Sequence, residues 1–211
     1  MSKEKIYIFD TTLRDGAQTQ GVDFSLNEKE KIAKSLDNLG VDYIEGGWPG
    51  ANPTDTEFFN KDQNFKNANL TAFGMTKKSE HSAKNDPMLS SLINSKSSSV
   101  CLFGKSWDFH VDVALGISND QNLENISESA KHIVNSGKEF MFDAEHFFDG
   151  YKSNPEYAIS CLKAAYDNGA RWIVLCDTNG GTLPHEISKI VEEVTKHIPG
   201  KNLGIHAHND T

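Results

Sequence analysis

Two histidines one residue apart, His206 and His208, are the side chains in this sequence best placed to bind a metal ion together. They follow residues 203–205, a short apolar stretch that reads as a β-strand. Side chains on a strand alternate between faces, so the two imidazoles are expected to point the same way. Two imidazoles and one carboxylate form a known type of divalent-metal site with open positions. The spacing favours this interpretation over two packing histidines.

The carboxylate for such a site is expected near the start of the chain, where Arg14 and Asp15 follow an apolar stretch. Asp15 could bind the metal while Arg14 faces a substrate carboxylate or a developing oxyanion. The planar guanidinium suits that task because it pairs with such groups in two places. A local ion pair that contributes little is the plainer alternative. Asp10 is a rival ligand, although its position nearer the strand fits a structural role.

Other polar side chains follow other predicted strands. Glu145 could be a general base at the end of its strand, or a solvated loop carboxylate. Thr178 offers a hydroxyl in a loop that Asp177 could hold. Lys105 could meet an anionic substrate or serve structure, and a structural role is the better interpretation of His110.

These residues need a scaffold that brings several strand ends together. Strand-like stretches recur at intervals of roughly thirty to forty residues, with helical spacing between them. The predicted strands cover residues 6–9, 41–45, 70–73, 99–103, 140–144, 172–176 and 203–205. The first predicted helix begins at the Ser25–Glu28 capping box and ends at Gly40, and the second begins at a cap near Thr54. The next three cover residues 79–94, 121–136 and 154–169, and the last begins at Pro184.

This alternation predicts an α/β fold, a (β/α)8 TIM barrel with its active site at the carboxyl ends of the strands. A doubly wound sheet uses the same units, but no G-x-G-x-x-G follows the first strand. Seven strands are expected before the sequence ends. We therefore expect one catalytic barrel domain over residues 1–211, truncated after the seventh strand and without a regulatory domain.

The composition narrows the possible partners. The net charge is −9 and no basic run occurs, so nothing in the charge pattern favours nucleic acid. No apolar stretch reaches the length of a membrane span, and no signal peptide is expected. The three cysteines, Cys101, Cys161 and Cys176, are widely spaced and odd in number, which is typical of a reduced cytoplasmic protein.

Two motifs together resemble a known family. They are FDTTLRDGAQ at residues 9–18 and HAHND at residues 206–210. The family is that of metal-dependent TIM barrels that includes 2-isopropylmalate synthase, homocitrate synthase, citramalate synthase and hydroxymethylglutaryl-CoA lyase. The resemblance covers essentially the whole chain. The stretches at residues 45–55, 103–110 and 143–150 look most like the citramalate synthase branch.

The resemblance implies roles for the residues of the two motifs. Asp15, His206 and His208 would bind a divalent ion such as Mg, Mn or Zn. Arg14 would stabilise charge on the oxygen of a 2-keto acid, and Gln18 would support that site. The family has a further asparagine ligand on its eighth strand. Because this chain lacks that strand, the 211 residues alone are expected to be poorly active.

The resemblance also implies a reaction. Thr178 would hold the keto acid carboxylate, and Glu145 would act as, or assist, the base that takes a proton from the methyl group of acetyl-CoA. Condensation with pyruvate and hydrolysis of the thioester would give citramalate, a precursor of isoleucine. The alternatives are a 2-isopropylmalate synthase that uses 2-oxoisovalerate, and a non-catalytic metal-binding fragment. A homodimer is expected.

Overall fold

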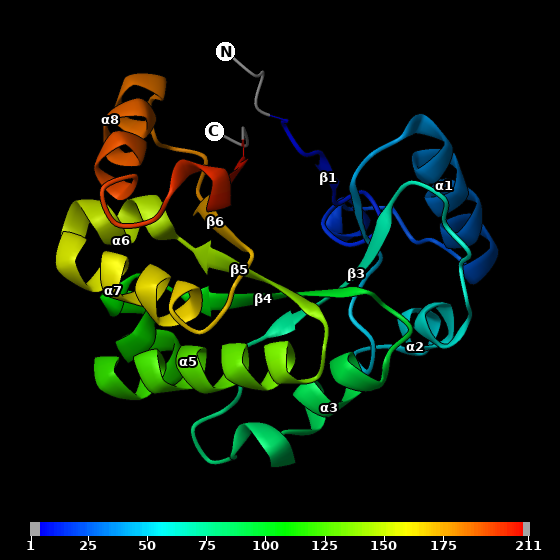
Figure 1. Cartoon of the computed structure of the whole chain (residues 1–211), viewed down its shortest axis with the longest axis horizontal. Helices are drawn as coiled ribbons and strands as arrows, with labels where there is room; N and C mark the ends of the chain where they lie inside the picture. The colour runs from blue at the N-terminus through cyan, green and yellow to red at the C-terminus, as the bar shows by residue number, and fades with distance from the viewer. Residues whose placement is uncertain (1–4, 209–211) are drawn as a thin grey trace. The chain divides into compact units, whose positions relative to one another are not determined.

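The computed structural model of the chain describes residues 5–208, so Asn209 and Asp210 of the second motif lie outside the described residues. Seven strands are found within this range, each close to a predicted position (Figure 1). They are β1 (Phe9–Asp10), β2 (Tyr43–Glu45), β3 (Asn69–Met75), β4 (Ser99–Lys105), β5 (Glu139–Glu145), β6 (Trp172–Asp177) and β7 (Leu203–Ala207). The first strand is shorter than predicted and starts three residues later.

The strands follow one another in the sheet in the order of the chain, from β1 to β7. The pairs β1–β2, β2–β3, β5–β6 and β6–β7 are parallel, and helices lie between consecutive strands in the sequence. A doubly wound sheet reverses its strand order at a switch point, whereas a (β/α)8 barrel does not. The predicted barrel architecture is therefore confirmed for the seven strands.

The described residues divide into two compact units, and each is treated by itself below. The first unit comprises residues 5–74 and 90–100, and includes β1, β2 and the helices α1 (Leu26–Leu39) and α2 (Pro53–Asn60). The second comprises residues 75–89 and 101–208, and includes β5 to β7 with the helices between them.

In the first unit, α1 has the predicted beginning and end. The Ser25 hydroxyl accepts a hydrogen bond from the N–H of Glu28, and the Glu28 carboxylate accepts one from the N–H of Ser25, which completes the capping box. Gly40 ends the helix with φ of 88°, a conformation that favours glycine. The N-cap of α2 is Asn52, two residues before the predicted cap near Thr54, because the Asn52 side chain accepts a hydrogen bond from the N–H of Asp55.

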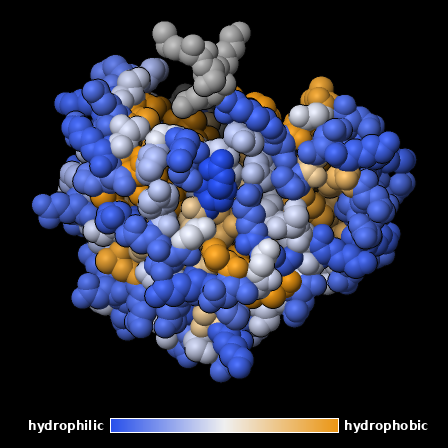
Figure 2. Space-filling model, in the orientation of Figure 1, coloured by the Kyte–Doolittle hydropathy of each residue, from blue (hydrophilic) through white to orange (hydrophobic). Residues whose placement is uncertain are grey.

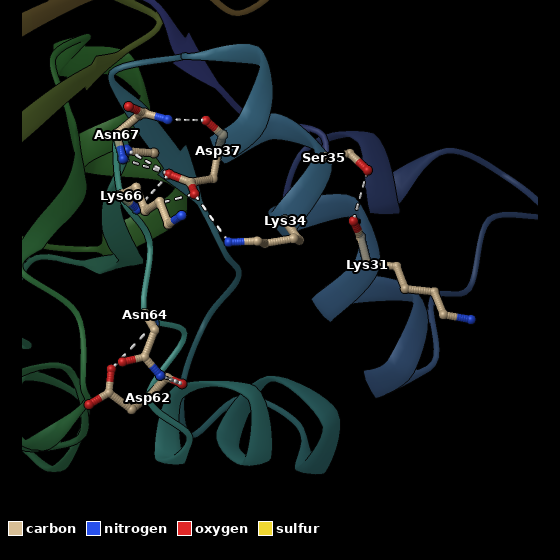
Figure 3. Close-up of polar contacts among 9 residues, drawn as sticks. Lys31, Lys34, Ser35, Asp37, Asp62, Asn64, Lys66 and Asn67 are labelled. Carbon is tan, nitrogen blue, oxygen red and sulfur yellow. Dashed lines mark hydrogen bonds and ion pairs between the residues drawn. The ribbon is translucent and has the colours of Figure 1, made fainter.

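The carboxylate of Asp37 joins the end of α1 to the loop that leads into β3. It is fully buried and accepts hydrogen bonds from the backbone N–H groups of Lys66, Asn67 and Ala68 at 3.0, 2.8 and 3.0 Å. Figure 3 shows this carboxylate pointing at the loop, with Lys34 on its other side. Burial acts to raise the pKa of Asp37, but the three N–H donors outweigh it and lower the pKa to about 2.

In the second unit, α5 (Asn119–Asn135) and α7 (Pro155–Tyr166) lie side by side next to β5 (Figure 1). Both match predicted helices, although each starts or ends a few residues away from the expected position. Helix α8 (Pro184–Val194) begins at Pro184 as predicted. Aromatic side chains from β5 and from α6 (Phe147–Ser153), namely Phe140, Phe142, Phe147 and Phe148, are buried in this unit.

Three local predictions are wrong or incomplete. The helix expected at residues 79–94 is only α3 (Pro87–Asn94), preceded by a short 3-10 turn at Ala83–Asn85. Asp86 accepts from the N–H groups of Met88 and Leu89 and so begins the helix there. The connection after β4 contains α4 (Asp108–His110) and a π-helical turn, η3 (Val111–Leu115). Neither these turns nor α6 was predicted.

Within residues 5–208, no helix is both long and apolar enough to cross a bilayer. The face shown in Figure 2 is mostly hydrophilic, with small hydrophobic patches between polar residues. The mean hydropathy of −0.53 agrees with that view. Scattered exposed apolar side chains are normal on globular proteins.

Candidate active site

Arg14 is fixed on three sides within the first unit. Its Nε donates to Oε2 of Glu45 at 2.6 Å, and its Nη1 donates to Oδ1 of Asp15 at 2.9 Å. The guanidinium lies 4.1 Å from the centre of the Phe73 ring. The Arg14–Asp15 ion pair is therefore present, but the buried Glu45 makes it part of a larger network. This network holds a positive, planar group at the end of β1.

The loop that carries Asp15 is shaped by its own backbone. The N–H groups of Arg14, Asp15 and Gly16 all point at the carbonyl of Thr11, at 3.1, 2.8 and 3.2 Å. Asp10 accepts from the N–H of Thr12 at 3.0 Å, which agrees with the structural role favoured for it above. Asp15 thus stands on a tight turn directly beyond the strand, with its side chain partly exposed.

A cavity of about 500 Å³ lies within the first unit beside this turn. Arg14 and Gln18 both line it, so the structure brings these two predicted residues to one cavity. Gln18 is exposed and ends the 3-10 turn η1 (Gly16–Gln18). Trp48 and Phe73, which pack edge to face, give the cavity an aromatic wall.

An ion pair between Lys29 and Asp55 also lines this cavity, and the sequence did not reveal it. The other carboxylate oxygen of Asp55 accepts from the N–H of Trp48 at 2.8 Å and from Asn52 at 3.0 Å. A side chain at Gly47, where φ is +129°, would meet this carboxylate at 2.6 Å. Only glycine fits there, and the pair fixes the loop after β2.

In the second unit, His206 and His208 lie on one side of β7. Their rings are stacked at 4.9 Å between centroids, with an interplanar angle of 20°. Both are partly buried, while Ile205 and Ala207 are exposed. The prediction that the two imidazoles point the same way is therefore confirmed. Two neighbouring imidazoles of this kind fit a divalent cation.

Two further donors, Asp143 and Cys176, lie beside His206. Cys176 is opposite His206 in the parallel register of β6 and β7, and Asp143 on β5 is opposite Val174. Donor atoms of the three side chains lie within 4.8 Å of one another. Sequence reasoning missed this group, although strand alternation could have revealed it. Asp143 lies two residues before Glu145, and Cys176 lies two before Thr178.

Glu145 ends β5 and forms an ion pair with Lys105 at the end of β4. The position of Lys105 is fixed by its backbone carbonyl, which accepts from the amide of Asn122 at 2.8 Å. That amide also donates to the Tyr157 hydroxyl at 2.8 Å. The backbone of Lys105 is therefore held in place by a hydrogen bond, and its ammonium group forms an ion pair with Glu145.

Thr178 connects the loops that follow β5 and β6. Its hydroxyl oxygen accepts from the N–H of His146 at 2.9 Å. His146 has φ of +56°, which is uncommon for a residue other than glycine. Asp149 accepts from the amide of Asn179 at 3.0 Å and lies 3.4 Å from Nδ1 of His146. These contacts fix the backbone around both Glu145 and Thr178.

Asp177 holds the loop after β6, as predicted. Its carboxylate is buried and accepts from the N–H of Thr182 at 3.0 Å and from the Thr182 hydroxyl at 2.9 Å. Gly180 adopts φ of +66° in the turn between them. Thr178 therefore projects from a closed, hydrogen-bonded loop.

His110 packs against this group of loops. Its ring lies 4.7 Å from that of Trp107 and contacts the ring of His146 edge to face at 4.4 Å. Its Nδ1 is buried and has no hydrogen-bond partner within residues 5–208. Burial lowers the pKa of His110, and the nearby His146 and Lys105 lower it further. A neutral ring at neutral pH follows.

The predicted site residues divide between the two units. Arg14, Asp15 and Gln18 belong to the first, and Glu145, Thr178, His206 and His208 belong to the second. Within the units, the structure brings Arg14 together with Asp15 and Gln18, and His206 together with His208.

Known proteins resemble the chain over nearly all its length. An "(R)-citramalate synthase" of Aquifex aeolicus is 55% identical over 210 residues, which are 99% of this chain and 40% of that protein. A "2-isopropylmalate synthase 1" of Caldanaerobacter subterraneus is 31% identical, over 100% of this chain and 52% of that protein. The crystal structure of a hydroxymethylglutaryl-CoA lyase from Pseudomonas aeruginosa matches with a TM-score of 0.80 at 18% identity. The match covers 97% of this chain and 68% of the lyase chain, which shows that the two share a fold.

The chain spans about 40% of the length of the citramalate synthases that it matches. A sequence model described as "HMGL-like" matches residues 5–211. That match includes both motifs, the strand ends that carry the site residues and all seven strands. The chain belongs to the HMGL-like family.

Proposed function

We propose that the protein carrying this chain condenses acetyl-CoA with pyruvate and hydrolyses the thioester to give citramalate. The observation that carries the proposal is the 55% identity, over 99% of this chain, to a protein named (R)-citramalate synthase. The 2-isopropylmalate synthase is clearly more distant, at 31% identity. By resemblance to the family, we also propose that the protein is a cytoplasmic homodimer.

A divalent cation, Mg, Mn or Zn, is part of the proposal. His206 and His208 would supply two imidazole ligands from β7, and Asp15 would supply the carboxylate. Support comes from the stacked histidines of the second unit and from the two family motifs. When bound, the cation supplies Lewis-acid polarisation of the keto acid carbonyl.

Arg14, Gln18 and Thr178 are proposed to bind the keto acid. Arg14 offers a positive planar group that Glu45 and Asp15 hold in one orientation, so little reorganisation is needed when charge develops on the substrate oxygen. Thr178 offers a hydroxyl to the substrate carboxylate from a loop closed by Asp177. Both are groups that stabilise an oxyanion.

Glu145 is proposed to receive the proton from the acetyl methyl group, or to assist that transfer. The C–H bond breaks, its electron pair remains on carbon as the enolate, and the proton passes to the carboxylate. Lys105, which pairs with Glu145, holds the carboxylate at the end of β5. The enolate carbon then attacks the keto carbon, which forms the new carbon–carbon bond.

The test is thiol release from acetyl-CoA by a chimera. Residues 1–211 of this chain replace the 40% of the Aquifex aeolicus relative that they match. Release is expected with pyruvate, and it should be at least tenfold slower with 2-oxoisovalerate. Faster release with 2-oxoisovalerate would identify a 2-isopropylmalate synthase. If the chimera folds but neither acid supports release, these residues form a non-catalytic domain. The 211 residues alone are expected to be poorly active in the same assay.

A further inference from the structure

Asp143 and Cys176 lie beside the proposed metal ligand His206, but the proposed function gives neither of them a role. The three side chains come from adjacent strands, β5, β6 and β7, which lie side by side in Figure 1. They share one face of the sheet, because Cys176 is opposite His206 and Asp143 is opposite Val174, two residues before Cys176. Their donor atoms lie within 4.8 Å of one another.

The imidazole of His206 has two nitrogen atoms, and a single cation takes only one of them. The second nitrogen then carries a proton and needs an acceptor. Histidines that bind metals donate this proton to a carboxylate or a carbonyl, which fixes the ring and makes it a stronger ligand. Asp143 brings a carboxylate to this position and is only 4% exposed.

We propose that Asp143 is the positioning residue for His206. Its carboxylate accepts a hydrogen bond from the protonated ring nitrogen of His206 when the other ring nitrogen binds the cation. The inference rests on the proposed function only in that both place a divalent cation at His206. The burial of Asp143 strengthens the contact, because a charged acceptor is worth more where water is excluded.

Cys176 takes no direct part in this arrangement. Its thiol donates to the carbonyl of Val174 on the same strand at 3.8 Å. Mn²⁺ and Mg²⁺ prefer oxygen ligands to sulfur. The cysteine therefore fills the space beside His206 while the carboxylate orients the ring.

The test is Mn²⁺ affinity of the chain, measured by titration calorimetry on the wild type and on Asp143→Asn. Loss of the carboxylate should weaken binding about 10- to 100-fold. Asp149→Asn is the matched control, because Asp149 is a carboxylate beside His146 in the same unit. It should bind Mn²⁺ as the wild type does. Circular dichroism establishes that each variant is folded.

A second readout separates orientation of the ring from general damage. In the Zn²⁺-loaded chain labelled with 15N-histidine, one nitrogen of His206 should hold a slowly exchanging proton, and Asp143→Asn should make that exchange fast. Unchanged Mn²⁺ affinity in folded Asp143→Asn, or no binding by the wild type, would overturn the proposal. Loss of affinity in Cys176→Ser would also overturn it, by making the sulfur a ligand. None of these readouts needs acetyl-CoA, so an inactive chimera refutes the proposed function alone.

Discussion

Replacing Asp37 by asparagine should destabilise the chain by removing the charged acceptor between α1 and the loop before β3. The carboxylate is fully buried and accepts three backbone N–H groups, as Figure 3 shows for Lys66 and Asn67. Burial alone would raise its pKa, yet these donors bring it from 3.8 to about 2. A pKa change of that size corresponds to about 2 kcal/mol of stability.

Urea unfolding followed by circular dichroism measures this loss. With a slope of about 2 kcal/mol per M, the midpoint of Asp37→Asn should fall by about 1 M at pH 7. The folded-state pKa lies below the unfolded value, so the contribution is complete above about pH 4 and is lost as the pH falls through about 2. The difference between wild type and variant should therefore be constant from pH 7 to 5 and shrink below pH 4.

Asp62→Asn is the matched control. Asp62 is exposed and accepts from the N–H of Asn64 at a long 3.4 Å, so its replacement should change the midpoint little. The reasoning fails if Asp37→Asn and Asp62→Asn unfold at the same urea concentration. It also fails if the effect of Asp37→Asn grows as the pH falls, since protonation should abolish it.

Three further predictions concern the site residues. Lys29→Met leaves the Asp55 carboxylate buried without its ammonium partner and should lower the free energy of unfolding in urea by about 3 kcal/mol. Lys61→Met breaks an exposed ion pair with Glu30 and should lower it far less, so equal losses in the two variants would contradict this. Lys105→Met removes a positive charge that lowers the pKa of His110, so the pKa of that ring, followed by NMR titration, should rise in the variant. A fall or no change would contradict the prediction. Thr178→Val should slow thiol release by the chimera at least tenfold, whereas the rate of Thr178→Ser should stay within about threefold of the unmutated chimera. Similar rates for the two variants would exclude a role for the hydroxyl.

Much of the fold was predictable because local chemistry determines it. Ser25 with Glu28 and Gly40 fixed the two ends of α1, and Pro184 fixed the start of α8. Short elements were not predictable in this way. The helices α4 and α6 and the π-helical turn have three to seven residues each, too few to show a helical period in the sequence.

The site was predictable where strand alternation applies and unpredictable where partners are distant in sequence. Alternation correctly placed His206 and His208 on one face, and it could also have revealed Asp143 and Cys176. The partner of Lys105, by contrast, depends on which strands become neighbours and on where each one ends. The sequence placed Glu145 at the end of its strand, but spacing alone could not pair it with Lys105.

The most direct test of the proposed metal site is the number and affinity of Mn²⁺ ions bound by the chain when Asp15 or Asp10 is replaced by asparagine. Both carboxylates follow the same apolar stretch, but Asp10 accepts from the N–H of Thr12 in a local turn. The account predicts one ion per chain in the wild type, at least about tenfold weaker binding in Asp15→Asn and in His208→Gln, and unchanged binding in Asp10→Asn. Wild-type affinity in Asp15→Asn together with loss of binding in Asp10→Asn would contradict it.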